Sequence, residues 1–364
     1  MTYLNDILFK ESKRPDLLLA RSLLSAGASA YRAGLGIRNG LYRSGIRKAT
    51  RLDVPVISIG NLTVGGTGKT PLVAYIASCL KQEGKKAVII SRGYKGRSRG
   101  TLTVSDEKTV LAGPGRAGDE PVLLARKLPG TPVLVNKDRA AAARTACDRF
   151  NPDIIILDDA YQHLAVARAA DILVIDAANP FGNGHLLPRG TLREPRSAIS
   201  RADLIIITKA NQAGDLTGLQ AVIKRYSGST PVLLADYMPG PVTDLKGQAE
   251  TEVSALAKRQ AFLVSGIAQP GSFKKTAEEL RIPICGEIAF SDHHPFTPFD
   301  LEDITRSVVE KKADYILTTE KDAVRFPVPE GYRFPLYSLG LDIRLKNGPE
   351  ELLSILRGKL TGTR

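Results

Sequence analysis

Short runs of valine, isoleucine and leucine alternate along this chain with stretches in which apolar residues recur at helical spacing. From about residue 52 onward the runs are nearly continuous in apolar residues, which is typical of parallel strands buried on both faces. They span Val54–Ile59, Ala87–Ser91, Pro132–Val135, Ile154–Leu157, Ile172–Ile175 and Leu204–Thr208. Helices are expected between them over Pro71–Glu83, Asp119–Lys127 and Arg139–Phe150. This order predicts an α/β fold with a doubly wound, mostly parallel sheet.

A second series of apolar runs predicts a smaller α/β lobe. Its runs span Val232–Ala235, Ala261–Ser265, Ile282–Ala289 and Tyr315–Thr318. The stretch from Tyr237 to Gly247 contains two prolines and two glycines and is interpreted as the connection between the lobes. We therefore expect an N-terminal helical segment over 1–50, a large domain over 51–236, the smaller lobe over 237–345 and a C-terminal helix over 346–364.

The N-terminal segment is both basic and amphipathic. Its first 52 residues hold ten lysines and arginines against three acids, which is more than half of the chain's net charge of +13. Leucine, isoleucine and tyrosine lie between these cations at roughly helical spacing, as in a helix that lies in a lipid interface. A helix that packs on its own domain and turns a basic face to solvent fits these residues equally well.

Composition narrows the class of protein. The cysteines Cys79, Cys147 and Cys285 lie far apart with no Cys-x-x-Cys pair, which argues against a disulfide framework or a zinc site and suits a reducing cytosol. The N-terminus lacks the residue order of a signal peptide, and no apolar run approaches the roughly 18 residues of a spanning helix. No nucleic-acid motif is present and aromatic content is 6%, so nucleic acid is not an expected partner.

The strongest local motif is a glycine-rich loop that precedes a lysine and a threonine. It stands between a predicted strand and a predicted helix, which is the context of a phosphate-binding loop. Glycines let backbone N–H groups point at phosphate oxygens, and the helix N-terminus adds its positive dipole end. Lys69 is expected on the β- and γ-phosphates and the Thr70 hydroxyl on Mg²⁺. The nucleotide-binding residues are Thr63, Val64, Gly65, Gly66, Thr67, Gly68, Lys69 and Thr70, with Thr63 in place of the usual first glycine.

An acidic strand end supplies the second part of a nucleotide site. The run Ile154–Leu157 is followed by Asp158 and Asp159, and a carboxylate beside a phosphate loop can hold Mg²⁺ directly or through water. The residues at 208–211 occupy the place of a guanine-reading motif, but Asn211 stands where that motif needs a carboxylate. ATP with Mg²⁺ is therefore the expected nucleotide.

A phosphate loop alone does not separate a kinase from a switch or motor ATPase. Further polar segments provide the base, the cations and the positioning groups that phosphoryl transfer to a hydroxyl requires. They are Ser91–Tyr94, Gly118–Pro121, Asp158–His163 and Asp292–His294. Each of these side chains also has a structural interpretation. Asp119 could simply cap a helix, and none of the four histidines has the spacing of a catalytic metal site.

Together these motifs resemble the tetraacyldisaccharide 4′-kinases, the lipid A 4′-kinases of Gram-negative bacteria. The shared segments run in family order over nearly the whole chain: SIGNLTVGGTGKTP (58–71), SRGYKG (91–96), GDEP (118–121), DDAYQH (158–163), NPFGNGHLLPRGTLREP (179–195), ITK (207–209) and DHHPFT (292–297). Ala160 and Tyr161 depart from the commoner Gly-Phe, but an aromatic residue is kept. The resemblance implies a P-loop NTPase fold and transfer of the ATP γ-phosphate to the 4′-hydroxyl of a tetraacylated disaccharide 1-phosphate.

The resemblance also implies roles for individual residues. Asp119 would be the general base and His293 its partner, which takes or shares the proton. Lys69 would act on the phosphates as a further catalytic group. Asp158 and Asp159 match the family's magnesium and nucleotide acids. Contacts with the substrate are expected at Arg92, Tyr94, Glu120, His163 and Arg189.

The resemblance finally favours a membrane role for the N-terminus. Moving an acylated substrate out of a bilayer costs about 0.8 kcal/mol per buried methylene, so the enzyme must go to the lipid. The basic helix over residues 15–48 is therefore expected to bind an anionic membrane surface. We expect a monomeric, peripheral (monotopic) protein on the cytoplasmic face of the bacterial inner membrane.

Two alternatives differ in what they require. A switch-type ATPase or GTPase of the same loop group would need a Cys/His metal cluster or a signature lysine early in the loop, where Thr63 and Val64 stand. A cytosolic small-molecule kinase or ligase would use the basic N-terminus only structurally. Both alternatives predict full activity without lipid.

Overall fold

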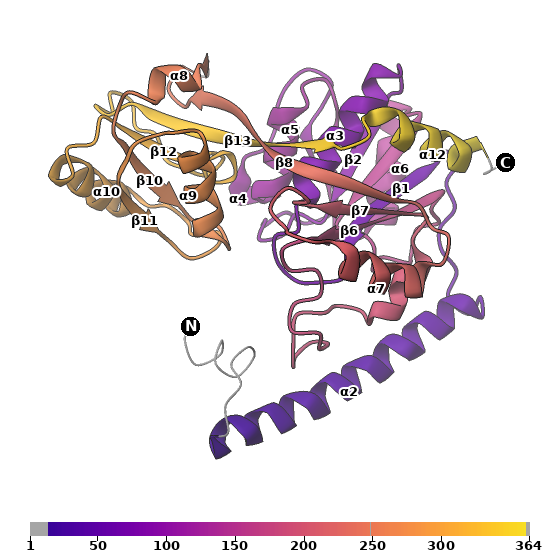
Figure 1. Cartoon of the computed structure of the whole chain (residues 1–364). Helices are drawn as coiled ribbons and strands as arrows, with labels where there is room; N and C mark the ends of the chain where they lie inside the picture. Colours follow the sequence, from indigo (N-terminus) through magenta and orange to yellow (C-terminus); the bar gives the residue numbers. More distant parts are fainter. Residues whose placement is uncertain (1–13, 248, 362–364) are drawn as a thin grey trace. The chain divides into compact units, whose positions relative to one another are not determined.

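The chain divides into two compact units in this computed structural model, which describes residues 14–247 and 249–361. Figure 1 labels their elements along the chain. Residues 1–13 and 362–364, at the ends of the predicted N-terminal segment and C-terminal helix, lie outside the described residues. Among the described residues, those within Met1–Arg92, Thr131–Tyr237 and Arg344–Arg364 form unit 1, and those within Gly93–Gly130 and Met238–Ile343 form unit 2.

Unit 1 is built on a parallel sheet, which confirms the predicted doubly wound α/β fold. Its strands pair in the order β7-β6-β1-β5-β2-β4, and the first residues of β8 pair with β7. The strands are β1 (Val56–Asn61), β2 (Ala87–Ser91), β4 (Val133–Val135), β5 (Ile154–Asp158), β6 (Ala170–Asp176) and β7 (Leu204–Thr208). The helices are α2 (Pro15–Arg43), α3 (Lys69–Gln82), α6 (Arg139–Phe150), η1 (Arg196–Arg201), α7 (Thr217–Ser227) and α12 (Pro349–Thr361).

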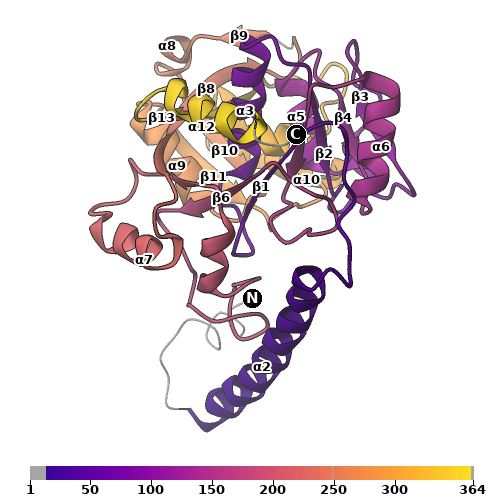
Figure 2. The ribbon, with the colours of Figure 1, turned by 90° about the vertical axis from the view of Figure 1, so that its right-hand side faces the viewer.

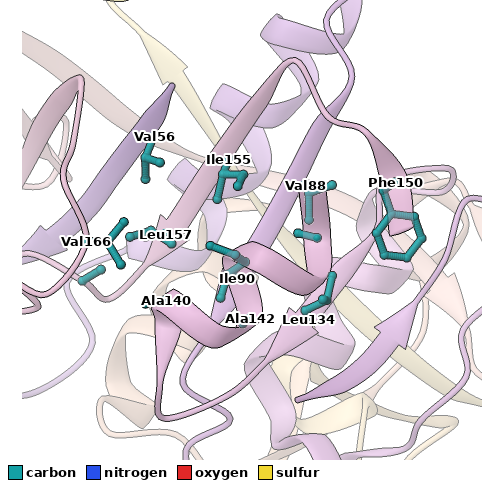
Figure 3. Packing of buried hydrophobic residues seen from close by; sticks show 13 residues of the cluster. Val56, Val88, Ile90, Leu134, Ala140, Ala142, Phe150, Ile155, Leu157 and Val166 are labelled. Atoms are coloured by element: carbon teal, nitrogen blue, oxygen red, sulfur yellow. The ribbon is translucent and has the colours of Figure 1, made fainter. Parts of the chain in front are cut away.

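The strands of unit 1 are buried on both faces. Ile155 and Leu157 of β5 pack with Ile90 of β2 against α6 on one face (Figure 3). The alternate residues Ile154 and Ile156 point to the other face and are also buried. Because side chains alternate between the faces of a strand, a strand covered on both sides needs a continuous apolar run. This is why the unbroken apolar pattern located these strands correctly.

The predicted basic segment forms one long helix, α2, which ends at Arg43 and so is shorter than the predicted 15–48. Figure 2 shows α2 as a single unbroken helix. Tyr31 contacts the segment 179–195 of the same unit, because its hydroxyl donates to the carbonyl oxygen of Arg193 at 2.9 Å. In the described part of the chain, no helix combines the length and apolarity that crossing a membrane requires.

Unit 2 is centred on a shorter parallel sheet. Its strands pair in the order β11-β10-β12-β13, and β9 pairs antiparallel with the end of β8. One face packs on α9 and the other on α10. The strands lying wholly in the unit are β3 (Leu102–Ser105), β9 (Glu250–Thr251), β10 (Ala261–Ser265), β11 (Ile284–Ala289) and β12 (Tyr315–Thr319). The helices are α4 (Pro114–Ala117), α5 (Asp119–Lys127), α8 (Val253–Leu256), α9 (Pro270–Glu279), α10 (Pro298–Glu310) and α11 (Glu320–Ala323).

Two long strands, β8 (Val232–Asp244) and β13 (Leu336–Leu345), contribute residues to both units. From the sequence we expect most of the β8 stretch to be a connection, because this stretch is rich in proline and glycine. The sequence analysis does not predict β13. In the structure Gly240 lies against Gly340, and a Cβ atom on Gly240 would be 2.9 Å from the carbonyl carbon of Gly340. Glycine allows two backbones to approach this closely, so here it marks a strand contact.

The sequence places residues 93–130 in the large domain, but the structure groups them with unit 2. The segment is held there by α5, which packs on α11. Lys127 at the end of α5 forms a 2.9 Å ion pair with Glu320 and donates to the carbonyl oxygen of Leu341 at 2.8 Å. These contacts join residues that are far apart in sequence, so no local pattern could reveal them.

Candidate active site

The loop between β1 and α3 has the backbone geometry of a phosphate-binding loop. Lys69 begins α3, and the preceding Gly68 is left-handed with φ +80°. Gly65 also has a positive φ, of +114°. Among the described residues no side chain caps the N-terminus of α3, so its first N–H groups can bind an anion.

Lys69 is held between an amide and a carboxylate. Its Nζ donates to Oδ1 of Asn61 at 3.0 Å and lies 3.4 Å from Oδ1 of Asp159. Both oxygens of Asp159 also accept from Nη1 of Arg193 at 2.9 Å. Burial raises the pKa of Asp159, but the charges of Lys69 and Arg193 more than offset this and lower it to about 2. Asp159 is therefore ionised at neutral pH.

Asp158 lies directly beside the strand that leads into the loop. It ends β5 and is in parallel register with Ile59 of β1. Its carboxylate is buried, and Oδ2 accepts from the Ser91 hydroxyl at 2.9 Å. Together with the Thr70 hydroxyl and Asp159, it gives a donor set of oxygen atoms, which suits Mg²⁺. The described residues contain no group of three or more His, Cys, Asp or Glu that could hold a metal ion.

The candidate base-reading segment is used structurally. The Asn211 side chain donates to the carbonyl oxygen of Tyr237 at 2.8 Å and accepts from its N–H at 3.0 Å. Lys209 forms a 2.5 Å ion pair with the buried Asp176. Both polar ends of the Asn211 amide are therefore engaged on β8, which fits the expectation that this segment does not read guanine.

Unit 2 brings Asp119 and His293 together although they are 174 residues apart in sequence. Asp119 begins α5, and His293 follows β11 with a positive φ of +58°. Nδ1 of His293 lies 2.9 Å from Oδ2 of Asp119, and its Nε2 lies 3.2 Å from Nζ of Lys321. A lysine ammonium can only donate, so we assign Nε2 as the acceptor and Nδ1–H as the donor to Asp119.

A third residue, Arg325, completes this group. Its Nη1 lies 2.5 Å from the same Oδ2 of Asp119. Burial raises the pKa of Asp119, but the hydrogen bond from His293 and the charge of Arg325 together more than offset it, so that the pKa lies below its ordinary value. The carboxylate is therefore ionised at neutral pH.

The five predicted substrate residues divide between the units. Tyr94 and Glu120 join the pair in unit 2: the Tyr94 ring is 5.9 Å from the His293 ring, and Glu120 is 4.0 Å from Nζ of Lys321. The other three lie in unit 1 and are Arg92, His163 and Arg189.

His163 and Arg189 have different surroundings within unit 1. Burial and the charges of Arg139 and Arg168 lower the pKa of His163 to about 4, so it is uncharged at neutral pH. Arg92 contributes to the same effect. Burial also lowers the pKa of Arg189, and the next cause is the charge of Arg21 on α2. Arg189 is therefore close to the N-terminal helix.

Sequence reasoning missed Arg193, Lys321 and Arg325. Arg193 lies inside a segment that the resemblance uses, but no local signal pairs it with Asp159. Lys321 and Arg325 follow β12 in the charged stretch at 318–326. The carboxyl ends of parallel strands gather at one edge of a sheet, so a run of charges directly after a buried strand was the available signal.

Two of the three glycines of the loop, Gly66 and Gly68, are expected to respond differently to substitution by alanine. At Gly68, φ is +80° and a Cβ would lie 1.8 Å from the Tyr237 hydroxyl oxygen. At Gly66 a Cβ would meet no atom within 4 Å. We expect Gly68→Ala to cost about 1–3 kcal/mol and to weaken binding of a fluorescent ATP analogue at least about tenfold. Gly66→Ala should leave the unfolding midpoint near wild type, because its Cβ meets no protein atom. Equal effects of the two changes would contradict this geometry.

Comparison with known proteins agrees with the resemblance seen in the motifs. Residues 20–361 match the family model of tetraacyldisaccharide-1-P 4′-kinase. The tetraacyldisaccharide 4′-kinase of Anaeromyxobacter sp. (strain Fw109-5) is 42% identical over 346 residues, covering 94% of this chain and 92% of that relative. The one from Syntrophus aciditrophicus (strain SB) is 38% identical over 336 residues, 89% of each chain. The crystal structure of the "apo" form of LpxK from Aquifex aeolicus in complex with ATP matches with a TM-score of 0.77 and 31% identity, covering 94% of this chain and 99% of that one. This chain therefore belongs to the tetraacyldisaccharide-1-P 4′-kinase family.

Proposed function

We propose that this chain transfers the γ-phosphoryl group of ATP to the 4′-hydroxyl of a tetraacylated disaccharide 1-phosphate. Its membership of the family gives the reaction class. The observation that carries the proposal is the Asp119–His293 pair, at 2.9 Å in unit 2. A kinase that acts on an alcohol needs a group beside the acceptor that takes the hydroxyl proton.

Asp119 is the residue we propose for that proton. Its Oδ2 is occupied by His293 and Arg325, while within the described residues Oδ1 accepts no hydrogen bond. Oδ1 therefore takes the proton as the hydroxyl oxygen forms its bond to the γ-phosphorus and the bond to the β-phosphate oxygen breaks, releasing ADP. A carboxylate with a lowered pKa is a weak base, so the proton moves late, when the oxygen has largely bonded to phosphorus and become acidic.

The loop residues of unit 1 hold the phosphates in this proposal. Lys69 leaves Asp159 for the β- and γ-phosphate oxygens, and the N–H groups at the start of α3 bind beside it. Thr70, Asp158 and Asp159 are the ligands proposed for Mg²⁺. Bound Mg²⁺ supplies positive charge that offsets the charge on the transferring phosphoryl group.

The remaining predicted contacts are assigned to the acceptor lipid. Tyr94 and Glu120 lie with the Asp119–His293 pair and are proposed to orient the sugar. Arg92 and Arg189 are proposed to bind phosphate groups as cations. His163 is uncharged at neutral pH because of its lowered pKa, so it would contact the substrate as a neutral hydrogen-bonding group.

We propose that α2 attaches the protein to an anionic membrane on its cytoplasmic side. Leu19, Leu23 and Ile37 are each about two-thirds exposed, at 65%, 67% and 67%. Their positions, together with the exposed Ala26 and Ala30, follow helical spacing along one side of α2. An uncharged stripe of this kind can enter a lipid interface, and the basic residues of the same helix favour an anionic one.

This attachment predicts that two substitutions to glutamate on α2 will differ in their effect on membrane binding. Leu23→Glu places a charge on the apolar stripe, whereas Ser29→Glu adds the same charge to an exposed position off it. Because burying a leucine contributes about 1.5–3 kcal/mol, Leu23→Glu should weaken binding to anionic vesicles at least about tenfold more than Ser29→Glu. Flotation of the protein with vesicles measures this. If the two variants bind alike, the stripe does not enter the membrane.

The reaction itself is tested by phosphate transfer to lipid. Wild-type protein is given radiolabelled ATP, Mg²⁺ and the acylated disaccharide 1-phosphate in mixed detergent micelles. We expect label in the lipid with wild type and almost none with Lys69→Ala, because that variant loses the cation on the β- and γ-phosphates. ATP hydrolysis without labelled lipid would contradict the proposal and favour a switch-type ATPase.

The role of Asp119 predicts a specific pattern of loss. Asp119→Ala should lower kcat by about 10²–10⁴-fold, the range for loss of a general base, while the affinity for ATP stays near wild type. Steady-state kinetics and a nucleotide titration measure the two quantities separately. A collapse of ATP affinity would instead make Asp119 a nucleotide or metal ligand.

A further inference from the structure

Behind the Asp119–His293 pair lies a buried polar network that the reaction scheme above does not use. Asp322 in α11 is fully buried. Its Oδ2 accepts from the N–H of Gly266 at 2.9 Å and from the Thr319 hydroxyl at 2.7 Å, and its Oδ1 pairs with Arg325. Every charge in this network is thus hydrogen-bonded, as burial requires.

Arg325 connects this network to the catalytic pair. Its side chain is only 8% exposed. Nε donates to the carbonyl oxygen of His294 at 2.9 Å, Nη2 to that of Gly266 at 2.8 Å, and Nη1 to Oδ2 of Asp119. The N–H of His293 donates to the same Gly266 oxygen at 3.0 Å. One rigid guanidinium therefore holds the main chain around His293 and the carboxylate of Asp119 at once.

We propose that Arg325 is a positioning residue for phosphoryl transfer, which fixes the carboxylate of Asp119 against His293 and leaves Oδ1 to face the acceptor hydroxyl. This inference rests on the proposed function. Arg325 itself touches neither substrate nor nucleotide in this scheme. Its effect comes from the planar fork, which can bond Asp119 and two carbonyl oxygens only in one orientation.

The charges around Asp119 determine how Arg325 affects titration. His293 and Arg325 face the carboxylate directly. Lys321 lies behind His293, with Asp292 at 3.4 Å and Glu120 at 4.0 Å from its Nζ, and Asp322 balances Arg325. A positive charge favours the ionised carboxylate, so removing Arg325 raises the pKa of Asp119. Transfer needs that carboxylate ionised, so the acidic limb of kcat/KM must move to higher pH.

The test compares Arg325→Gln and Arg325→Lys in the full chain. For Arg325→Gln we expect kcat to fall by up to about a hundredfold through misplacement, with little change in the KM for ATP. The acidic limb of the plot of kcat/KM against pH should shift to higher pH by about one unit or more. Arg325→Lys restores the charge but not the fork, so it should return the limb towards wild type while kcat stays low.

A matched control separates positioning from general stability. Arg259→Gln removes another arginine of unit 2, one that lies over the Tyr315 ring at 5.3 Å. It should leave both the limb and kcat unchanged. A loss of unfolding free energy in Arg325→Gln without movement of the limb would overturn the proposal and leave Arg325 a structural residue. Wild-type kcat together with an unshifted acidic limb in Arg325→Gln would also overturn the proposal.

A second readout does not depend on activity. Nitrogen NMR of the histidine rings, with His293 assigned by a His293→Gln variant, reports which ring nitrogen carries the proton. We expect the Nδ1–H form in wild type and a mixture of forms in Arg325→Gln. An unchanged Nδ1–H form in that variant would overturn the positioning role. If wild type labels no lipid, the proposed function fails, and this measurement still decides whether Arg325 fixes the pair.

Discussion

The parallel pairing of β1 with β5 is the interaction on which the site of unit 1 depends. Ile59 and Asp158 are in register, so the strand that leads into the glycine-rich loop and the strand that carries the acids end at the same edge of the sheet. Apolar packing on both faces makes a shift of this register costly. The positions of Lys69, Asp158 and Asp159 relative to one another are therefore consequences of core packing.

In unit 2 the common edge of the parallel strands positions the residues of the proposed base rather than a phosphate-binding loop. The carboxyl ends of β10 and β11 lead to Gly266 and to the turn with His293, and β12 leads to α11 and then to the turn with Arg325. Because parallel strands end at a common edge, these segments meet there, and the carbonyl oxygen of Gly266 accepts from both His293 and Arg325. Asp119, the first residue of α5, completes this group of side chains. Each unit thus supplies one set of groups to the proposed reaction, phosphate binding in unit 1 and the base in unit 2.

The sequence predicted those features that depend on neighbours in the chain. Unbroken apolar runs located the strands buried on both faces. The glycine-rich loop stands between a strand and a helix as predicted, although the helix already begins at Lys69. Partners distant in sequence carry no such local signal. Asp119 and His293 were paired only through the family resemblance, Arg325 was missed, and residues 93–130 were placed in the wrong unit. The segment around Gly240 was predicted to be a connection because glycine is common in turns. Glycine also allows two strands to approach closely, and this is its use at Gly240.

In the proposed reaction one phosphoryl group is added at the 4′-hydroxyl of the acylated disaccharide while the 1-phosphate is kept. Proton–phosphorus correlation NMR of the purified lipid product, made by wild-type protein from ATP and the acylated disaccharide 1-phosphate, tests this most directly. We expect a new phosphorus signal coupled to the proton on carbon 4′ and an unchanged signal for the 1-phosphate. A new signal coupled to any other sugar proton, or conversion of the 1-phosphate into a diphosphate, would contradict it.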